Sequence, residues 1–182
     1  MTTTGESPRV SLRPVGPGDA EFLLDVYGST RADEMALVSW WTDEQRRAFL
    51  KSQLDAQRGE YEKRFPAADY SVILVDDAPA GRLWIARTPE QIRLLDIALL
   101  PAFRRRGIGA TLLGRLIEES EETGRPLRHM VFELNPEAVR FYRRLGFALL
   151  EQHGAYLEME RVPAGAGGGV GGGGASPAGA GG

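Results

Sequence analysis

The chain has 182 residues, no cysteine and a formal net charge of -3, so it is long enough for one domain with a sizeable core and forms neither disulfides nor thiolate metal sites. The acidic balance gives no general attraction to nucleic acid or to an anionic membrane, and no stretch approaches the roughly 18 consecutive apolar residues that a membrane span needs. Because the first residues also lack an apolar signal segment, we expect a cytoplasmic protein without nucleic-acid or membrane partners.

The composition changes sharply near the carboxyl end of the chain. Residues 163–182 are almost wholly Gly, Ala, Ser and Pro, and such a segment cannot bury enough apolar surface to offset its ordering entropy. The sequence therefore predicts a flexible tail over 163–182, a flexible start over 1–8 and one folded domain over 9–162. We find no internal repeat within that domain that would indicate a solenoid.

The first half of the domain contains one short strand and two helices. Val10–Arg13 alternates apolar and polar residues, which is typical of a strand. Asp19 is a candidate N-cap for the first helix. The second helix begins after Thr42, because Thr42 and Gln45 have the spacing of a capping box, and it ends before Pro66.

A hairpin and a buried strand follow these helices. Tyr70–Val75 and Gly81–Arg87 are apolar runs separated by the turn Asp76–Pro79, which predicts an antiparallel pair. The next strand, at Leu94–Leu100, is apolar on both faces, as expected for a central strand that is covered on two sides.

Asp96 is the acidic residue in that central strand. A buried carboxylate is costly unless it is paired with a cation. We therefore expect an ion pair with Arg82 or Arg93, and we keep a role in orienting or deprotonating a substrate as the alternative.

A candidate anion site follows the central strand. The stretch Arg104-Arg105-Arg106-Gly107-Ile108-Gly109 stands immediately before a helix pattern with one apolar face. The first amides of a helix have no internal partner and lie at the positive end of its dipole, the glycines let the backbone approach a diphosphate, and the arginines add charge. A Walker loop is excluded because Arg115 and Leu116 replace its Lys and Ser or Thr, and a dinucleotide fingerprint is excluded because Leu112 replaces its third glycine.

The last third of the domain begins with a strand at Leu127–Leu134. His129 on this strand is expected to be a structural side chain, because no second ligand-type pattern stands near it in the sequence. A helix with Asn135 as its N-cap then ends at Gly146. Two paired strands close the domain, at Phe147–Gln152 and Ala155–Arg161.

Two motifs in this order point to a family. The first is Arg104-x-x-Gly107-x-Gly109-Ala110, and the second is Asn135-x-x-Ala138-x-x-Phe141-Tyr142-x-x-x-Gly146-Phe147. They resemble the acyl-CoA-binding motif and the second motif of the GNAT superfamily of N-acetyltransferases, and the resemblance spans essentially residues 9–162. It implies a single-domain fold of the α/β (α+β) class, in which a mixed central sheet is splayed between the strands Ile92–Leu100 and Leu127–Leu134 and is flanked by helices on both faces.

The resemblance also implies a cofactor site in the opening of the sheet. Acetyl-CoA would lie there as co-substrate, with its pantetheine arm paired to the backbone of Ile97, Ala98 and Leu99, and no metal is expected. Asn135 would contact the cofactor as well. The pyrophosphate would be held by Arg104, Arg105, Arg106, Gly107, Ile108, Gly109 and Ala110.

The implied reaction is transfer of the acetyl group to a primary amine by direct attack through a tetrahedral intermediate, since the chain has no cysteine for an acyl-enzyme. Tyr142 would be the catalytic residue that protonates the departing thiolate, because a phenol with an unperturbed pKa of about 10 keeps its proton at neutral pH. Family members often carry a glutamate where this chain has Arg93 and Met130. Glu133 and Asp96, acting through water, are left as candidate bases.

The acceptor is left open between small-molecule and peptide amines, as is the oligomeric state, with a homodimer as one alternative. A non-catalytic acyl-CoA-binding module of the same fold is the alternative function. Nucleic-acid binding by the arginine clusters is disfavoured by the acidic balance. The segment Ala36–Trp41 is expected to show ordinary aromatic packing, with a part in the acceptor pocket as the alternative, because loops near the first two helices often have that role in the family.

Overall fold

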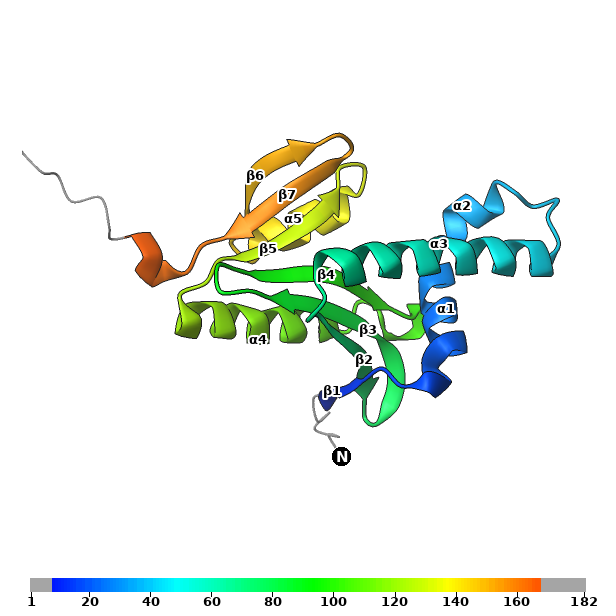
Figure 1. The fold of residues 1–182 in the computed structure, drawn as a ribbon, viewed down its shortest axis with the longest axis horizontal. Helices are drawn as coiled ribbons and strands as arrows, with labels where there is room; N and C mark the ends of the chain where they lie inside the picture. The colour runs from blue at the N-terminus through cyan, green and yellow to red at the C-terminus, as the bar shows by residue number, and fades with distance from the viewer. Residues whose placement is uncertain (1–7, 168–182) are drawn as a thin grey trace, which may run out of the picture.

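In the computed structural model, which describes residues 8–167, a seven-stranded mixed sheet runs through the protein and helices cover both of its faces (Figure 1). The strands follow the order β1-β2-β3-β4-β5-β7-β6. They are β1 (Val10–Pro14), β2 (Asp69–Val75), β3 (Ala78–Arg87), β4 (Ile92–Leu99), β5 (Leu127–Phe132), β6 (Ala148–His153) and β7 (Tyr156–Arg161). The helices are α1 (Ala20–Ser29), α2 (Ala32–Ala36), α3 (Asp43–Arg64), α4 (Ile108–Thr123) and α5 (Pro136–Arg144). The predicted fold class is confirmed.

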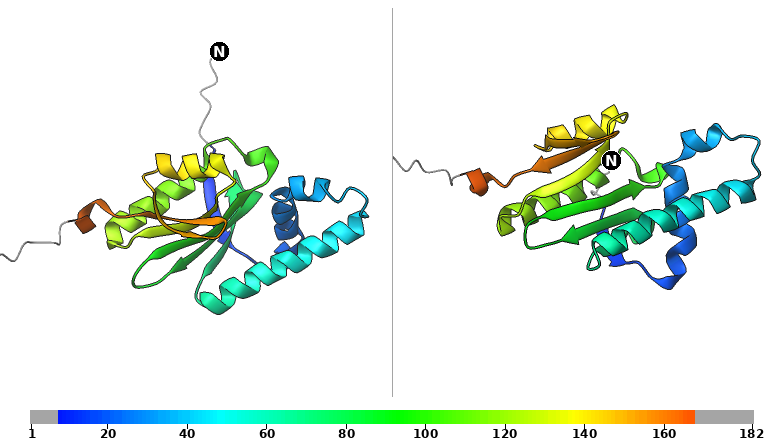
Figure 2. Two further views of the ribbon diagram at one scale, coloured as in Figure 1. Left: turned by 90° about the horizontal axis from the view of Figure 1, so that it is seen from above. Right: turned by 45° about the horizontal axis from the view of Figure 1, so that its top comes forward.

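Two separate apolar clusters hold the helices to the sheet. Helices α4 and α5 lie on one face, and α1 and α3 lie on the other (Figure 2). The cluster under α4 contains the apolar face expected from the sequence, at Ile108, Leu112, Leu113 and Leu116, with Ile117 packed against it. On the opposite face, the rings and side chains of α1 and α3 pack on Trp84 and Leu95 of the sheet. On each face of the sheet, the apolar sides of the helices are therefore buried against the strands, as an amphipathic helix requires.

The sheet opens between its only parallel pair of strands in the described residues, β4 and β5. Their register covers only Ile92↔Leu127, Arg93↔Arg128 and Leu94↔His129. Beyond this point β4 stays paired with β3 alone, and a bulge occurs where Trp84 pairs with Asp96 while Ile85 pairs with Leu94. The bulge leaves Leu95 without a register partner, which bends the strand at the start of the opening. The predicted splay between these strands is confirmed.

Local sequence signals set the ends of the later helices. Thr42 and Gln45 form the predicted capping box, with the Gln45 amide donating to the Thr42 hydroxyl at 3.2 Å and the Thr42 amide donating to the Gln45 side chain at 2.8 Å. The Asn135 side-chain oxygen accepts from the Ala138 amide at 3.1 Å at the start of α5. Gly146 follows α5 with a φ of 86°, a conformation that glycine adopts readily.

Two expectations for the first half of the chain were wrong. Asp19 stands before α1 but makes no capping bond to it; its carboxylate instead accepts two hydrogen bonds from Arg13 and one from the Gly16 amide, each of 2.7 Å. Ordinary packing holds for Trp41, whose ring meets Phe49 edge-on at 5.5 Å, whereas Trp40 is 76% exposed. An aromatic residue in a short connection is placed by its tertiary neighbours, which the local pattern does not reveal.

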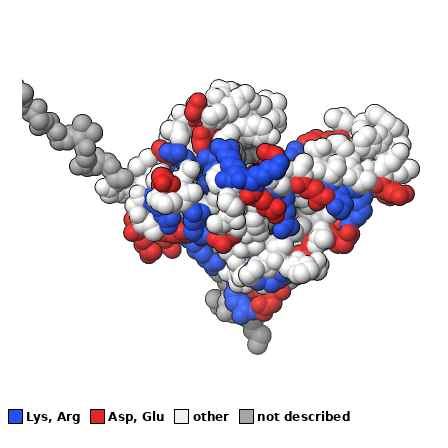
Figure 3. All heavy atoms as spheres, viewed as in Figure 1, with Lys and Arg blue, Asp and Glu red and all other residues white. Residues whose placement is uncertain are grey.

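The predicted flexible start over 1–8 and tail over 163–182 lie mostly outside the described residues. The described chain continues to Gly167, with Pro163 buried and the Ala164 amide donating to Glu121 at 2.8 Å. None of the helices in the described part is long and apolar enough to cross a membrane. Acidic and basic side chains are interspersed over the face drawn in Figure 3, so that face has no large region of single sign.

Candidate active site

The opening between β4 and β5 leads into two adjoining cavities. The α4 cavity, of about 710 Å³, extends from the opening to the start of α4, and the β5 cavity, of about 930 Å³, lies along β5 and reaches α1 and α3. Six residues line both of them: Ile97, Ala98, Asn135, Glu137, Ala138 and Tyr142. The two cavities therefore meet at the unpaired side of β4 and at the start of α5.

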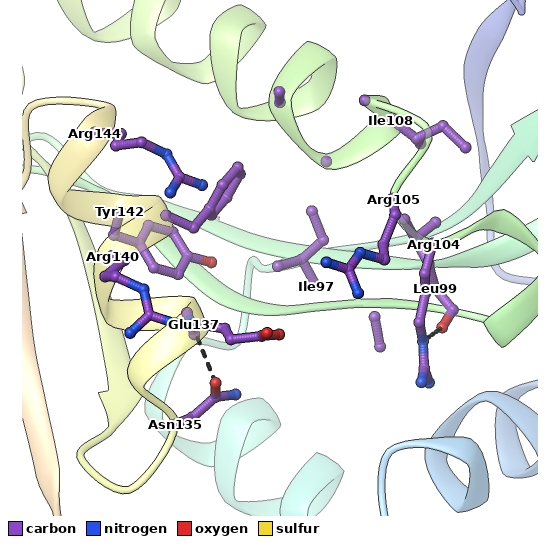
Figure 4. A pocket seen from close by; sticks show the side chains of 16 residues that line it. Ile97, Leu99, Arg104, Arg105, Ile108, Asn135, Glu137, Arg140, Tyr142 and Arg144 are labelled. Atoms are coloured by element: carbon purple, nitrogen blue, oxygen red, sulfur yellow. Dashed lines mark hydrogen bonds between the residues drawn. The ribbon is translucent and has the colours of Figure 1, made fainter.

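The α4 cavity has the properties of an anion site. Gly107 precedes α4 with a φ of 77°. The first three residues of the helix, Ile108, Gly109 and Ala110, line this end of the cavity, and the first amides of a helix have no acceptor within it. Figure 4 shows Arg104 and Arg105 on one side of the cavity and Arg140 and Arg144 of α5 on the other. Against these four guanidinium groups the lining contains only one carboxylate, that of Glu137. Unbonded helix amides together with several arginines suit a multiply charged group such as a diphosphate.

The structure brings all but one of the predicted site residues to this cavity. The exception is Arg106, whose guanidinium lies 5.7 Å from the centre of the Phe103 ring and does not line the cavity. The reason is the backbone of Arg105, which has a φ of 59°. That left-handed conformation reverses the chain direction, so successive arginines cannot all face the same side. The predicted role of Arg106 in the cofactor site is not supported by this geometry.

Arg104 lines the cavity but is already engaged by the protein. Its Nε donates to the Leu99 carbonyl at 2.8 Å, and its Nη2 donates to the carbonyl and hydroxyl of Ser29 at 3.1 and 3.0 Å. These bonds connect the end of β4 to the end of α1. Arg104 therefore holds the loop in place, while Arg105 makes no side-chain hydrogen bond within the described residues.

Arg140 and Arg144 are the site residues that the sequence did not reveal. The sequence assigned neither of them to the cofactor site, yet both line the α4 cavity. They stand four residues apart, so they lie on the same side of the helix. Their spacing was the available signal, but it becomes informative only once α5 is known to pack beside the anion loop.

Tyr142 stands where the two cavities meet. It is 4% exposed, and its ring packs edge-on against Phe141 at 5.3 Å and Phe147 at 5.4 Å. Figure 4 shows its hydroxyl directed into the cavity, and no protein group in the described residues hydrogen-bonds to it. Burial raises the pKa of Tyr142 above its ordinary value, with the nearby Asp96 charge acting in the same direction. The phenol therefore keeps its proton at neutral pH.

An ion pair forms part of the wall of the β5 cavity. Arg82 donates from Nε to Asp96 at 2.5 Å, and the Arg82 side chain is only 2% exposed. Its guanidinium also lies 4.4 Å from the centre of the Trp84 ring, an arrangement that stabilises a buried cation. The predicted pairing of Asp96 with an arginine is confirmed, which weakens the alternative in which this carboxylate is free to act on a substrate.

The rest of that cavity has a mixed lining, in which tyrosines and carboxylates accompany aliphatic side chains and Arg31. Its lining includes the tyrosines Tyr27, Tyr61, Tyr142 and Tyr156 and the carboxylates of Asp33, Glu34 and Glu137. Tyr61 donates to the Leu95 carbonyl at 2.9 Å, and burial raises the pKa of Tyr61 to about 12. Neither Trp40 nor Trp41 lines this cavity.

Glu133 does not belong to the site. It lies beyond the end of β5, is exposed, and accepts a hydrogen bond from Gln152 at 3.1 Å. It lines neither of the two cavities. One of the two candidate bases is therefore removed by its position, and the other, Asp96, is bonded to Arg82.

A family model described as "Acetyltransferase (GNAT) family" matches residues 35–147. The chain belongs to the GNAT acetyltransferase family. The match includes both motifs together with β4 and β5, which precede them, and the family assignment from the sequence is confirmed.

The alignments between this chain and solved structures of the same fold span nearly the whole length of those structures. PaiA N-acetyltransferase from Thermoplasma acidophilum, in complex with coenzyme A, has a TM-score of 0.61 at 19% identity and covers 85% of this chain and 99% of its own. The Campylobacter jejuni N-acetyltransferase PseH, in complex with acetyl coenzyme A, has a TM-score of 0.54 at 15% identity, with 85% and 99% covered. A Corynebacterium glutamicum protein described as histone acetyltransferase HPA2 and related acetyltransferase has a TM-score of 0.60 at 19% identity, with 87% and 98% covered.

At these identities the likeness shows the shared fold and not a shared acceptor. No curated protein matched the sequence significantly. The substrate of this GNAT protein must therefore be argued from its own cavities.

Proposed function

We propose that this GNAT protein is an N-acetyltransferase that moves the acetyl group of acetyl-CoA to a primary amine. The observation that carries the proposal is the position of the Tyr142 hydroxyl at the junction of an arginine-rich cavity and a second cavity lined by tyrosines and carboxylates. A bound thioester and a bound amine would meet at that junction. Structures of similar fold from Thermoplasma acidophilum and Campylobacter jejuni hold coenzyme A and acetyl coenzyme A, respectively, which supports the same co-substrate here.

The residues of the α4 cavity fit the parts of acetyl-CoA. The first amides of α4 would bind the pyrophosphate together with Arg105, Arg140 and Arg144. The side of β4 at Ile97–Leu99 has no strand partner from β5. Apart from the Leu99 carbonyl, which accepts from Arg104, the backbone groups on this side are available to pair with the amides of the pantetheine arm. The Asn135 side-chain nitrogen is also available, because the capping bond uses only its oxygen.

The chemistry follows from what each group can exchange. The amine nitrogen forms a bond to the acetyl carbon while the bond from that carbon to sulfur breaks, and an amide of β4 would stabilise the charge that develops on the oxygen. The Tyr142 hydroxyl gives its proton to the departing thiolate. The chain has no cysteine to carry the acetyl group, so we expect direct transfer between two substrates bound together, which predicts sequential kinetics.

A thiol-release assay with acetyl-CoA and a panel of primary amines tests the proposal. Amine-dependent release of free thiol supports an enzyme, whereas binding of acetyl-CoA without release for every amine would support the non-catalytic module instead. The panel should include small amines, amino acids and peptides, because the sequence and the cavities leave the acceptor open.

The anion site can be tested separately with Gly109→Glu. An added Cβ at Gly109 would come no closer than 3.9 Å to Phe141, so the domain should fold, while the new carboxylate would repel the phosphates. We expect calorimetry to show loss of acetyl-CoA binding. The matched control is Gly59→Glu in α3, where an added Cβ would have nothing within 4 Å, and which should bind normally. Unchanged affinity in a folded Gly109→Glu protein would remove the anion-site assignment.

A further inference from the structure

His129 closes the sheet at the point where β4 and β5 separate. It belongs to the last register pair of these strands, with Leu94. Its Nδ1 lies 2.9 Å from the Leu94 carbonyl oxygen. A carbonyl oxygen can only accept a hydrogen bond, so Nδ1 must carry the proton. In a neutral imidazole the other nitrogen, Nε2, then holds a lone pair.

The side chain that carries this lone pair is part of the wall of the β5 cavity, where the acceptor would bind. His129 lines the β5 cavity, and its ring centre lies 4.7 Å from that of Tyr142. Within the described residues no protein group hydrogen-bonds to Nε2. The proton acceptor and the proposed proton donor are therefore neighbours at the junction of the two cavities.

The charge state of His129 is set by burial and by three neighbouring groups on β4. Burial lowers its pKa most strongly, and the Arg93 cation on β4 lowers it further. The Leu94 carbonyl and the Asp96 carboxylate, both also on β4, oppose this shift. The group that faces it from α5 is Tyr142, which is neutral, and its β7 register partner is Met159. The net direction is downward from the ordinary value, so His129 is unprotonated at neutral pH and can accept a proton.

We propose that His129 is the general base of the acetyl transfer and takes, at Nε2, a proton from the ammonium form of the acceptor. This inference rests on the proposed function. The ammonium N–H bond breaks, its electron pair stays on nitrogen and forms the bond to the acetyl carbon, and the proton passes from Nε2 to solvent. The amine loses a second proton as it becomes an amide, and that proton replaces the one that Tyr142 gives to the thiolate.

The two carboxylates considered from the sequence are poorer candidates for this role. Asp96 is bonded to Arg82 at 2.5 Å, and Glu133 lines neither cavity. His129 combines a free lone pair with a position in the β5 cavity. It also needs no rearrangement of the ion pair that holds β3 to β4.

The variant His129→Asn separates the proposed chemistry from the structural bond. The amide nitrogen of asparagine occupies roughly the place of Nδ1 and can still donate to the Leu94 carbonyl, but asparagine has no basic nitrogen in the place of Nε2. With the amine that gives the highest turnover in the thiol-release screen, we expect kcat/KM at pH 7 to fall by roughly 10²-fold or more. The acetyl-CoA affinity measured by calorimetry should stay unchanged.

The pH dependence distinguishes a base from a structural residue. The loss in His129→Asn should shrink as the pH rises from roughly 7 to 9, because more of the amine is then neutral without help. A loss of equal size at every pH would mean that the imidazole ring acts through its packing and not as a base, and it would overturn the proposal. A folded variant with wild-type kcat/KM across this range would overturn it as well.

The tautomer can be read without any acceptor. The chain has only two histidines, so nitrogen NMR of the full chain, compared with that of His153→Gln, assigns both rings. We expect His129 at pH 7 to be neutral with its proton on Nδ1. A proton on Nε2, or a charged ring at pH 7, would overturn the inference and leave the proposed function standing. Absence of thiol release by the wild-type protein with every amine would overturn both.

Discussion

Replacing Gly81 of β3 by alanine should displace the neighbouring strand β4, which lines both cavities. A Cβ added at Gly81 on β3 would lie 2.1 Å from the Ala98 carbonyl oxygen and 3.0 Å from the Leu99 Cα. Cβ atoms essentially never come closer than 3.0 Å to another heavy atom, so the first contact must lengthen by at least the 0.9 Å between 2.1 and 3.0 Å. The neighbour is backbone and cannot rotate away, so β4 itself must move. Overpacking of this kind typically costs about 1 to 3 kcal/mol.

The expected effects can be measured on stability and on turnover. A loss of that size should lower the melting temperature by about 2 to 12 °C, at roughly 2 to 4 °C per kcal/mol for a chain of this length. Because β4 would hold the thioester, a displacement near 1 Å should also lower kcat/KM by roughly 10²-fold. The control is Gly114→Ala in α4, where an added Cβ has nothing within 4 Å and should stabilise the helix by up to about 1 kcal/mol. A Gly81→Ala protein with unchanged stability and turnover would refute the close-packing argument.

Three further predictions address the site and the stability of the domain. Tyr142→Phe keeps the packed ring and should lower kcat by roughly 10²-fold with little change in acetyl-CoA affinity; a wild-type rate would contradict its role as acid. Arg144→Ala should weaken acetyl-CoA binding by about tenfold at low salt and by less at high salt, whereas Arg143→Ala, which lines neither cavity, should not; equal losses would point to a general charge effect. The hydrogen bonds from Arg13 lower the pKa of Asp19 to about 2, below its unfolded value of about 3.9, so the stability advantage over Asp19→Asn should be full above about pH 5 and be lost as the pH falls through about 2, as urea unfolding would show. An advantage that does not change with pH would argue against the Asp19 assignment.

Short-range signals made most of the fold predictable. The capping residues Thr42 and Asn135 and the apolar face of α4 act within a few positions of the chain, and the structure has them as expected. The splay of the sheet came from the resemblance to the family and not from periodicity. The short helix α2 and the exposure of Trp40 were missed, because neither is determined by its immediate neighbours in sequence.

The sequence predicted those residues of the candidate site that belong to the two motifs. Gly107 lines the α4 cavity as the motif predicts, whereas Arg106 does not line it. The left-handed conformation of Arg105, the residue before Arg106, cannot be predicted from the sequence. Arg140 and Arg144 depend on how α5 docks beside the anion loop. The partner of His129, the Leu94 carbonyl, stands 35 positions earlier in the chain, and no local pattern contains that contact.

The three-pair register between β4 and β5 has a consequence for the protein before it meets its co-substrate. Past Leu94, β4 is an edge strand in the interior of a sheet, and an edge with free amides and carbonyls can pair with strands of other chains. A pantetheine arm bound along that edge would hydrogen-bond to these amides and carbonyls, as a neighbouring strand does, and would leave no exposed edge. Coenzyme A at a hundred times its Kd would then stabilise the domain by about 2.7 kcal/mol. Purification without coenzyme A should accordingly favour aggregation, and adding it back should suppress light scattering on heating.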